Sequence, residues 1–155
     1  MTDHRPRLFE SDAEIRRIGE GMIACSLPKS DWTHEAHLAA CLWMVRDRPD
    51  IVAERDLPVM IPRYNESVGG VNSDTEGYHE TITQVYVAAV RDHLSELDEA
   101  ATLLEAVNAL LVSARLAAAD LFKRKAILGG GKTKFRPAGS CCCGRRMKPD
   151  EQQQG

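Results

Sequence analysis

Apolar residues recur at helical spacing along most of this chain, and this periodicity constrains the fold more than any other feature. Ser11-Asp12-Ala13-Glu14 resembles a helix capping box, and apolar residues follow it at positions 15, 18, 22 and 23. A second periodic segment starts near Asp31, which can act as its N-cap, and ends near Asp47. Aromatic residues make up only 5% of the 155 residues, whereas Ala and Leu are abundant, which favours helices over strands.

Three further segments complete the predicted fold. Residues 50–62 predict a short, irregular helix, because Pro62 should bend or break it. A strongly apolar helix is expected over residues 77–94, capped by Asp74 or Thr75, and an Ala- and Leu-rich helix over residues 99–126. We therefore predict an all-α domain, residues 1–128, that forms a compact bundle of four to five helices.

The segment 129–155 differs from the rest in composition. It is rich in Gly, Cys and Gln, carries six basic and two acidic residues, and has few apolar residues to bury. We expect this basic tail to be disordered. Three of the five cysteines are adjacent at positions 141–143, which does not predict a disulfide framework.

Charge and hydropathy exclude several classes of protein. Residues 1–128 carry 14 basic and 21 acidic residues, and this net charge of −7 argues against nucleic-acid binding, which needs clustered Lys and Arg. The N-terminus has no apolar run typical of a signal peptide, and no segment approaches the roughly 20 apolar residues of a membrane helix. We expect a cytoplasmic protein without nucleic-acid or membrane partners; the oligomeric state is left open.

Two short blocks place histidines at the start of two predicted helices. In W-T-H-E-A-H-L (residues 32–38), His34 and His37 are three residues apart, and Cys41 follows on the same face. In G-Y-H-E-T-I-T (residues 77–83), His79 begins the next long helix. If the helices pack together, His34, His37 and His79 would form a three-histidine site for a divalent metal ion such as zinc or iron. Cys41 is more typical of a small buried apolar residue than of a ligand.

Other polar residues complete the candidate site. Glu80 is the preferred acid–base partner, with Glu35 as a second carboxylate for that role. Arg63, Tyr64 and Asn65 form a polar trio that either binds a ligand or simply makes a solvated turn. His93 is interpreted as a polar helix-end residue, and Trp32 as a packing anchor.

Three functional hypotheses therefore stay open. The first is a metal-binding protein that uses His34, His37 and His79, and this hypothesis includes a metal-dependent enzyme. The second is a metal-free protein that binds a small molecule through the histidines and residues 63–65. The third is a non-catalytic interaction module in which the histidines only cap and pack.

Three blocks together resemble a family of small uncharacterised bacterial proteins. They are W-T-H-E-A-H-L, R-Y-N-E-S-V-G (residues 63–69) and N-S-D-T-E-G-Y-H-E-T-I-T (residues 72–83), in that order, and the resemblance covers roughly residues 30–95. It implies a helical fold and points to the histidines and residues 63–65 and 77–81, but it implies no activity. Family members end in an ordered W-x-x-P-D-L segment, whereas this chain has only Met147-Lys148-Pro149-Asp150 in its tail.

Overall fold

The computed structural model describes residues 6–72 and 78–113, and these residues form an all-α fold. The described residues contain five α-helices and one short 3₁₀ helix. In chain order, the elements are α1 (Asp12–Ile23), η1 (Lys29–Asp31), α2 (His34–Asp47), α3 (Ala53–Ser67), α4 (Glu80–Glu96) and α5 (Leu103–Val112). The predicted all-α bundle of four to five helices is therefore confirmed.

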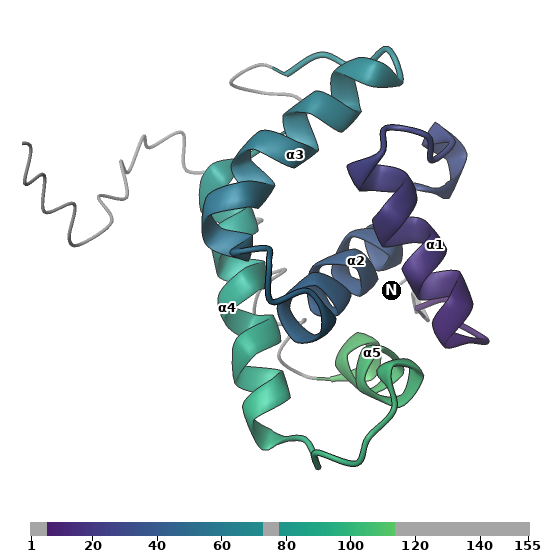
Figure 1. Ribbon diagram of the computed structural model, residues 1–155, viewed down its shortest axis with the longest axis vertical. Coiled ribbons are helices and arrows are strands. Elements are labelled where there is room, and N and C mark those ends of the chain that lie inside the picture. The colour runs from purple at the N-terminus through teal and green to yellow at the C-terminus, as the bar shows by residue number, and fades with distance from the viewer. Residues whose placement is uncertain (1–5, 73–77, 114–155) are drawn as a thin grey trace, which may run out of the picture.

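Helix α2 lies at the centre of the bundle and contacts each of the other four α-helices. Figure 1 shows α1 on one side of it, α3 and α4 on the other, and α5 against its remaining flank. Eight of its fourteen residues, Ala36 and all of 38–44, are buried, so apolar side chains surround the helix on every side. Such all-round burial is typical of a core helix.

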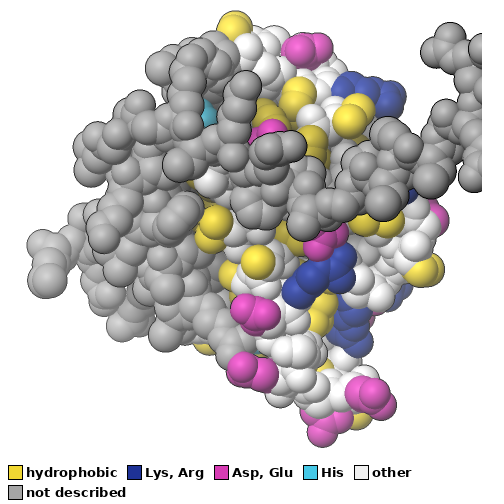
Figure 2. All heavy atoms as spheres, turned by 90° about the vertical axis from the view of Figure 1, so that its left-hand side faces the viewer, with side chains coloured by type: hydrophobic (Ala, Val, Ile, Leu, Met, Phe, Trp, Pro, Cys, Tyr) yellow, Lys and Arg dark blue, Asp and Glu magenta, His cyan; other side chains and the backbone are white. Residues whose placement is uncertain are grey.

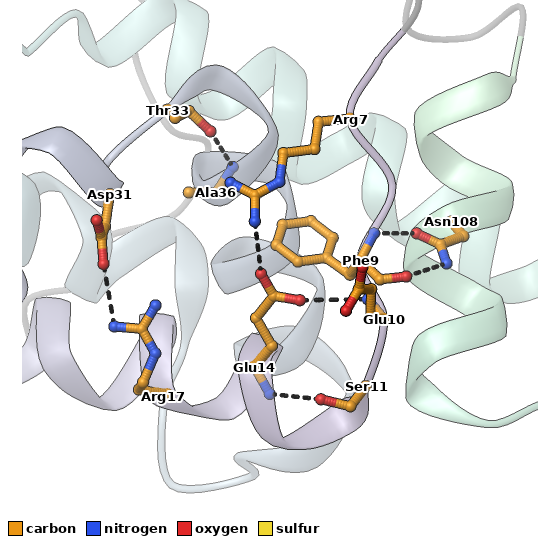
Figure 3. Close-up of polar contacts among 10 residues, drawn as sticks. All are labelled: Arg7, Phe9, Glu10, Ser11, Glu14, Arg17, Asp31, Thr33, Ala36 and Asn108. Carbon is orange, nitrogen blue, oxygen red and sulfur yellow. Dashed lines mark hydrogen bonds and ion pairs between the residues drawn. The ribbon is translucent and has the colours of Figure 1, made fainter.

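The N-terminal segment and the ends of α1 and α5 are joined by side-chain hydrogen bonds (Figure 3). Ser11 caps α1 by accepting from the backbone N–H of Glu14, as predicted, whereas the Glu14 carboxylate accepts from the backbone of Glu10 instead of closing the capping box at Ser11. The Asn108 side chain on α5 both accepts from and donates to the backbone of Phe9. These bonds attach the segment before α1 to the opposite end of the described chain.

The second helix begins three residues later than the sequence predicted. Asp31 ends η1 and receives Arg17 in an ion pair with an N–O distance of 3.1 Å. Thr33 is the actual N-cap, and its hydroxyl accepts from the backbone N–H of Ala36 (Figure 3). The prediction was wrong because Asp31 and Thr33 are both good capping residues and lie close together in the sequence. Asp31 is the last residue of the 3₁₀ helix, and Thr33 caps α2.

Helix α3 is continuous although it contains two prolines, so the prediction that Pro62 would break it was wrong. Pro58 lacks the N–H that would donate to the Glu54 carbonyl four residues earlier. The Gln84 side chain on α4 donates to that carbonyl instead, at 3.0 Å. Arg91 of the same helix also forms a two-pronged ion pair with the Glu54 carboxylate. Contacts with α4 thus offset part of the cost of a proline inside α3.

The last two helices begin later than predicted. Helix α4 starts at Glu80 with His79 as N-cap, and the alternative caps Asp74 and Thr75 lie outside the described residues. Helix α5 starts at Leu103 and not at Glu99, because Thr102 and Glu105 form a complete capping box there. The predicted continuation of this helix to residue 126 and the predicted disordered tail also lie outside the described residues.

His93 lies in the last turn of α4, so its interpretation as a helix-end residue agrees with the structure. It is buried, and its Nε2 donates to the Ala106 carbonyl on α5 at 2.9 Å. It therefore also joins two helices. On the outside, the face that carries α4 mixes acidic, basic and apolar side chains (Figure 2). None of the helices in residues 6–72 and 78–113 has the length and apolar character required to cross a membrane.

Candidate functional site

A cavity of about 300 Å³ lies between α2, α3 and α4, with the end of α1 beside it. Its apolar wall comes from all four helices: Met22, Leu38, Ala40, Leu57, Ile61 and Ile82. This volume is at the lower end of the range typical of small-molecule sites, which are mostly apolar with a few polar groups. The remaining wall is polar and contains most of the residues that the sequence singled out.

The three predicted histidines all line this cavity, on two different helices. His34 and His37 begin α2, and His79 is the residue just before α4. The ring of His34 lies edge-on to Tyr86, with 5.7 Å between the ring centroids. The structure therefore places the two histidine blocks at one cavity, as the sequence predicted.

His37 has a defined orientation. Its Nδ1 lies 2.6 Å from the Thr33 carbonyl, and because a carbonyl oxygen only accepts, Nδ1 carries the proton. In the neutral ring the lone pair is then on Nε2. The ring also packs against Trp32, with a centroid separation of 3.9 Å, and Trp32 in turn packs edge-on against Tyr64. The α2 side of the cavity is thus built from ordered aromatic rings.

The geometry does not supply a preformed metal centre. Among the described residues, no three His, Cys, Asp or Glu side chains are grouped so that they could hold a metal ion. Cys41 lines the cavity, but burial raises the pKa of its thiol to about 12, so it is not the thiolate that metals prefer. The prediction that Cys41 is a buried apolar residue is consistent with this, and the three-histidine metal site stays a prediction.

The two candidate carboxylates lie outside the cavity wall. Glu80 is exposed in the first turn of α4. Partial burial of Glu35 acts to raise its pKa, but hydrogen bonds from its own backbone and from the Thr33 hydroxyl outweigh this, and the pKa is lowered. A carboxylate with a lowered pKa is a weak proton acceptor at neutral pH. Neither residue is placed to act on a molecule inside the cavity, and the role of Glu80 stays a prediction.

The predicted polar trio separates into three environments. Arg63 is exposed and does not line the cavity. Tyr64 is fully buried, and its hydroxyl donates to the Leu27 carbonyl at 3.1 Å. Asn65 alone lines the cavity, and its side-chain amide donates to Asn72 at 3.2 Å. Successive residues on a helix point in different directions, about 100° apart, so a trio adjacent in sequence does not form one site.

Two residues to which the sequence analysis gave no chemical role carry the buried donor groups of this site. The indole N–H of Trp32 and the hydroxyl of Tyr78 are buried without a hydrogen-bond partner among the described residues, and both side chains line the cavity. Thr83 lies close enough to Tyr78 to act against the rise in its pKa, and the Thr83 hydroxyl itself donates to the His79 carbonyl at 3.1 Å. Leaving a buried donor unpaired costs about 1–3 kcal/mol, so such groups call for an explanation.

The charge of the cavity wall is equally informative. Among the residues that the structure describes, its polar members are three histidines, three hydroxyl side chains, an amide, an indole and a thiol, and no Lys, Arg, Asp or Glu is one of them. Burial raises the pKa of Tyr78 to about 12, so its hydroxyl keeps its proton and remains a donor. The wall therefore offers hydrogen-bond donors on an apolar background without a permanently charged side chain.

The chain matches no protein-family model, no curated protein and no solved structure. The resemblance to a bacterial family therefore stays a prediction, and the site must be interpreted from its own geometry.

Proposed function

We propose that this protein binds a small organic molecule in the cavity between α2, α3 and α4. The observation that carries the proposal is the pair of buried, unpaired donors, Trp32 and Tyr78, in the wall of a largely apolar cavity of about 300 Å³. Native proteins rarely leave such donors unsatisfied, and a ligand that accepts a hydrogen bond removes the cost. Of the hypotheses derived from the sequence, the metal-free small-molecule binder fits these features best.

The volume limits the size of the ligand. An engineered apolar cavity of roughly 150 Å³ holds one benzene ring. A cavity of about 300 Å³ is twice that size and suits a molecule of about two fused rings. The aromatic groups of Trp32, His37 and Tyr86 in the wall favour a planar ligand, because stacked and edge-on ring pairs add to the free energy of burial.

A cavity-filling substitution tests this proposal. Ala40 is buried in the cavity wall, whereas Ala88 is exposed on α4. We expect Ala40→Leu to weaken binding of the two-ring hydrocarbon indane at least tenfold, because the added side chain occupies the ligand's space. Ala88→Leu, with the same change in side chain, leaves binding unchanged. The dissociation constants are measured by NMR titration of the ¹⁵N-labelled protein, and equal binding by all three proteins would refute the site.

A second candidate function is metal binding by His34, His37 and His79. One observation favours it: the Nδ1 proton of His37 is held by the Thr33 carbonyl, which orients the ring and leaves the lone pair on Nε2. Metal-binding histidines commonly have such an arrangement. The ring positions must change for the three nitrogens to converge, since the described residues contain no group of three ligands in place.

Metal analysis distinguishes the two candidates. The untagged protein and its His34→Ala, His37→Ala and His79→Ala variants are analysed for bound metal and titrated with zinc, iron and manganese. Near-stoichiometric metal that is lost in all three variants would favour the metal site over the organic ligand. Wild type that takes up none of these ions would leave the organic ligand as the better account.

A further inference from the structure

We infer that the ligand is an uncharged, planar molecule of about two rings that carries a carbonyl oxygen, held by the Tyr78 hydroxyl and the Trp32 indole N–H. This inference rests on the proposed function and adds the chemical class of the ligand. It follows from three properties of the cavity wall: the type of its unpaired groups, their placement, and the lack of Lys, Arg, Asp and Glu among its described residues.

Both unpaired groups are donors. An indole N–H can only donate, and Tyr78 keeps its proton because its burial disfavours the phenolate. A carbonyl oxygen has two lone pairs and can accept from both donors at once. A ligand that offers only donors could pair with the Tyr78 oxygen but would leave the Trp32 N–H unpaired, and a ligand without a polar atom would leave both groups unpaired.

The donors come from two different sides of the cavity. Trp32 lies between η1 and α2, and Tyr78 lies two residues before α4. Both side chains are partly buried and their donor atoms are covered, so each donor reaches the ligand only when its side chain moves. Trp32 packs against the His37 and Tyr64 rings, so its movement is coupled to theirs. The carbonyl therefore lies between the start of α2 and the start of α4, and the rings extend towards the apolar wall.

The described residues of the wall also offer no carboxylate, ammonium or guanidinium group as a partner for a charged ligand. A buried ammonium group needs a carboxylate partner, and none of the lining side chains is acidic. A phosphate or sulfate group is usually held by Arg or Lys, and none lines the cavity. The neutral carbonyl is the acceptor that this wall can bury without an opposite charge.

Three probes of one size and shape test the inference: indane, which has no polar atom, 1-indanone, which adds a carbonyl, and 1-aminoindane, which is a cation at neutral pH. Dissociation constants are measured for wild type and for Tyr78→Phe, which removes only the hydroxyl. We expect wild type to bind 1-indanone about five- to tenfold more tightly than indane, and 1-aminoindane more weakly than either. In Tyr78→Phe the ratio of the affinities for 1-indanone and indane falls, because the carbonyl loses one of its two donors.

The Trp32 indole proton provides a second measurement that is made on the wild-type protein. Its NMR signal, assigned by nuclear Overhauser effects within the Trp32 side chain, shifts downfield with 1-indanone and not with indane. Equal affinities of indane and 1-indanone in wild type, or an equal loss of both in Tyr78→Phe, would overturn the carbonyl inference while the binding cavity stands. If indane itself fails to bind, the proposed function is what has failed.

Discussion

Single residues differ sharply in role even where they are neighbours in the sequence. Tyr64 and Asn65 are adjacent in α3, yet the first supports the core and the second lines the cavity. The fully buried Tyr64 ring packs against Trp32, and its hydroxyl satisfies the Leu27 carbonyl in the connection after α1. The residue therefore acts on the candidate site indirectly, by holding Trp32 and the preceding loop in place.

Removing only the Tyr64 hydroxyl tests this supporting role. We expect Tyr64→Phe to lower the free energy of unfolding by about 1–2 kcal/mol, because the buried Leu27 carbonyl loses its donor. Arg63→Ala, at the exposed neighbouring position, changes stability by less than about 0.5 kcal/mol. Urea unfolding measures the free energy of unfolding of both variants. If Tyr64→Phe were as stable as Arg63→Ala, the supporting role of the Tyr64 hydroxyl would be contradicted.

The two cysteines of the described residues differ in a way that chemistry can detect. Cys41 is buried and its pKa is raised to about 12, so at pH 8 only about one thiol in 10⁴ is the reactive thiolate. Cys25 is partly exposed in the loop after α1. We expect iodoacetamide to modify Cys25 much faster than Cys41, as measured by mass spectrometry of peptides. Equal rates would mean that the cavity wall around Cys41 opens readily.

At the scale of elements, much of the fold follows from local signals that can be recognised in the sequence. The Ser11 cap and the end of α2 at Asp47 were predicted correctly. The start of α5 was missed although Thr102 and Glu105 have the spacing of a capping box, so this signal was present and overlooked. The continuity of α3 through its prolines was not predicted, because at Pro58 it depends on the Gln84 side chain of another helix.

The packing of α1 against α2 depends on Gly19. A Cβ at this position would collide with the Trp43 ring at Cε3 and Cζ3. We expect Gly19→Ala to destabilise the fold by about 2 kcal/mol, because the two helices must move apart. Glu20→Ala, exposed on the same helix, provides the matched control in thermal unfolding. A Gly19→Ala variant as stable as this control would contradict the close packing.

The ion pair between α3 and α4 gives stability a predictable pH dependence. The Arg91 guanidinium hydrogen bond lowers the pKa of Glu54 from its ordinary value of 4.5, so the pair contributes stability above that pH and loses it as the pH falls through the lowered pKa. We expect Arg91→Gln to cost at most about 0.5 kcal/mol near neutral pH, since both groups are partly exposed. The difference in free energy of unfolding between wild type and Arg91→Gln, measured with urea, should shrink between about pH 6 and about pH 3. A difference that grows as the pH falls would contradict the stabilising role of the ionised pair.

For the whole molecule, the candidate site arises where the central helix meets α3 and α4. The sequence analysis proposed that His34, His37 and His79 form one metal site, and all three line the cavity, although among the described residues they are not grouped to hold a metal ion. It interpreted Trp32 as a packing anchor and gave Tyr78 no role of its own. Whether a buried donor has a partner depends on what lies opposite in three dimensions, and a linear pattern does not encode that.

The central claim is that an organic ligand occupies this cavity, and the most direct test is to locate a bound probe. Intermolecular nuclear Overhauser effects are measured between 1-indanone and the methyl groups of the ¹³C-labelled protein. We predict contacts with Leu38, Ile61 and Ile82, which line the cavity from three different helices. Contacts only with exposed methyl groups such as those of Val59 and Val112, or none at all, would contradict the account.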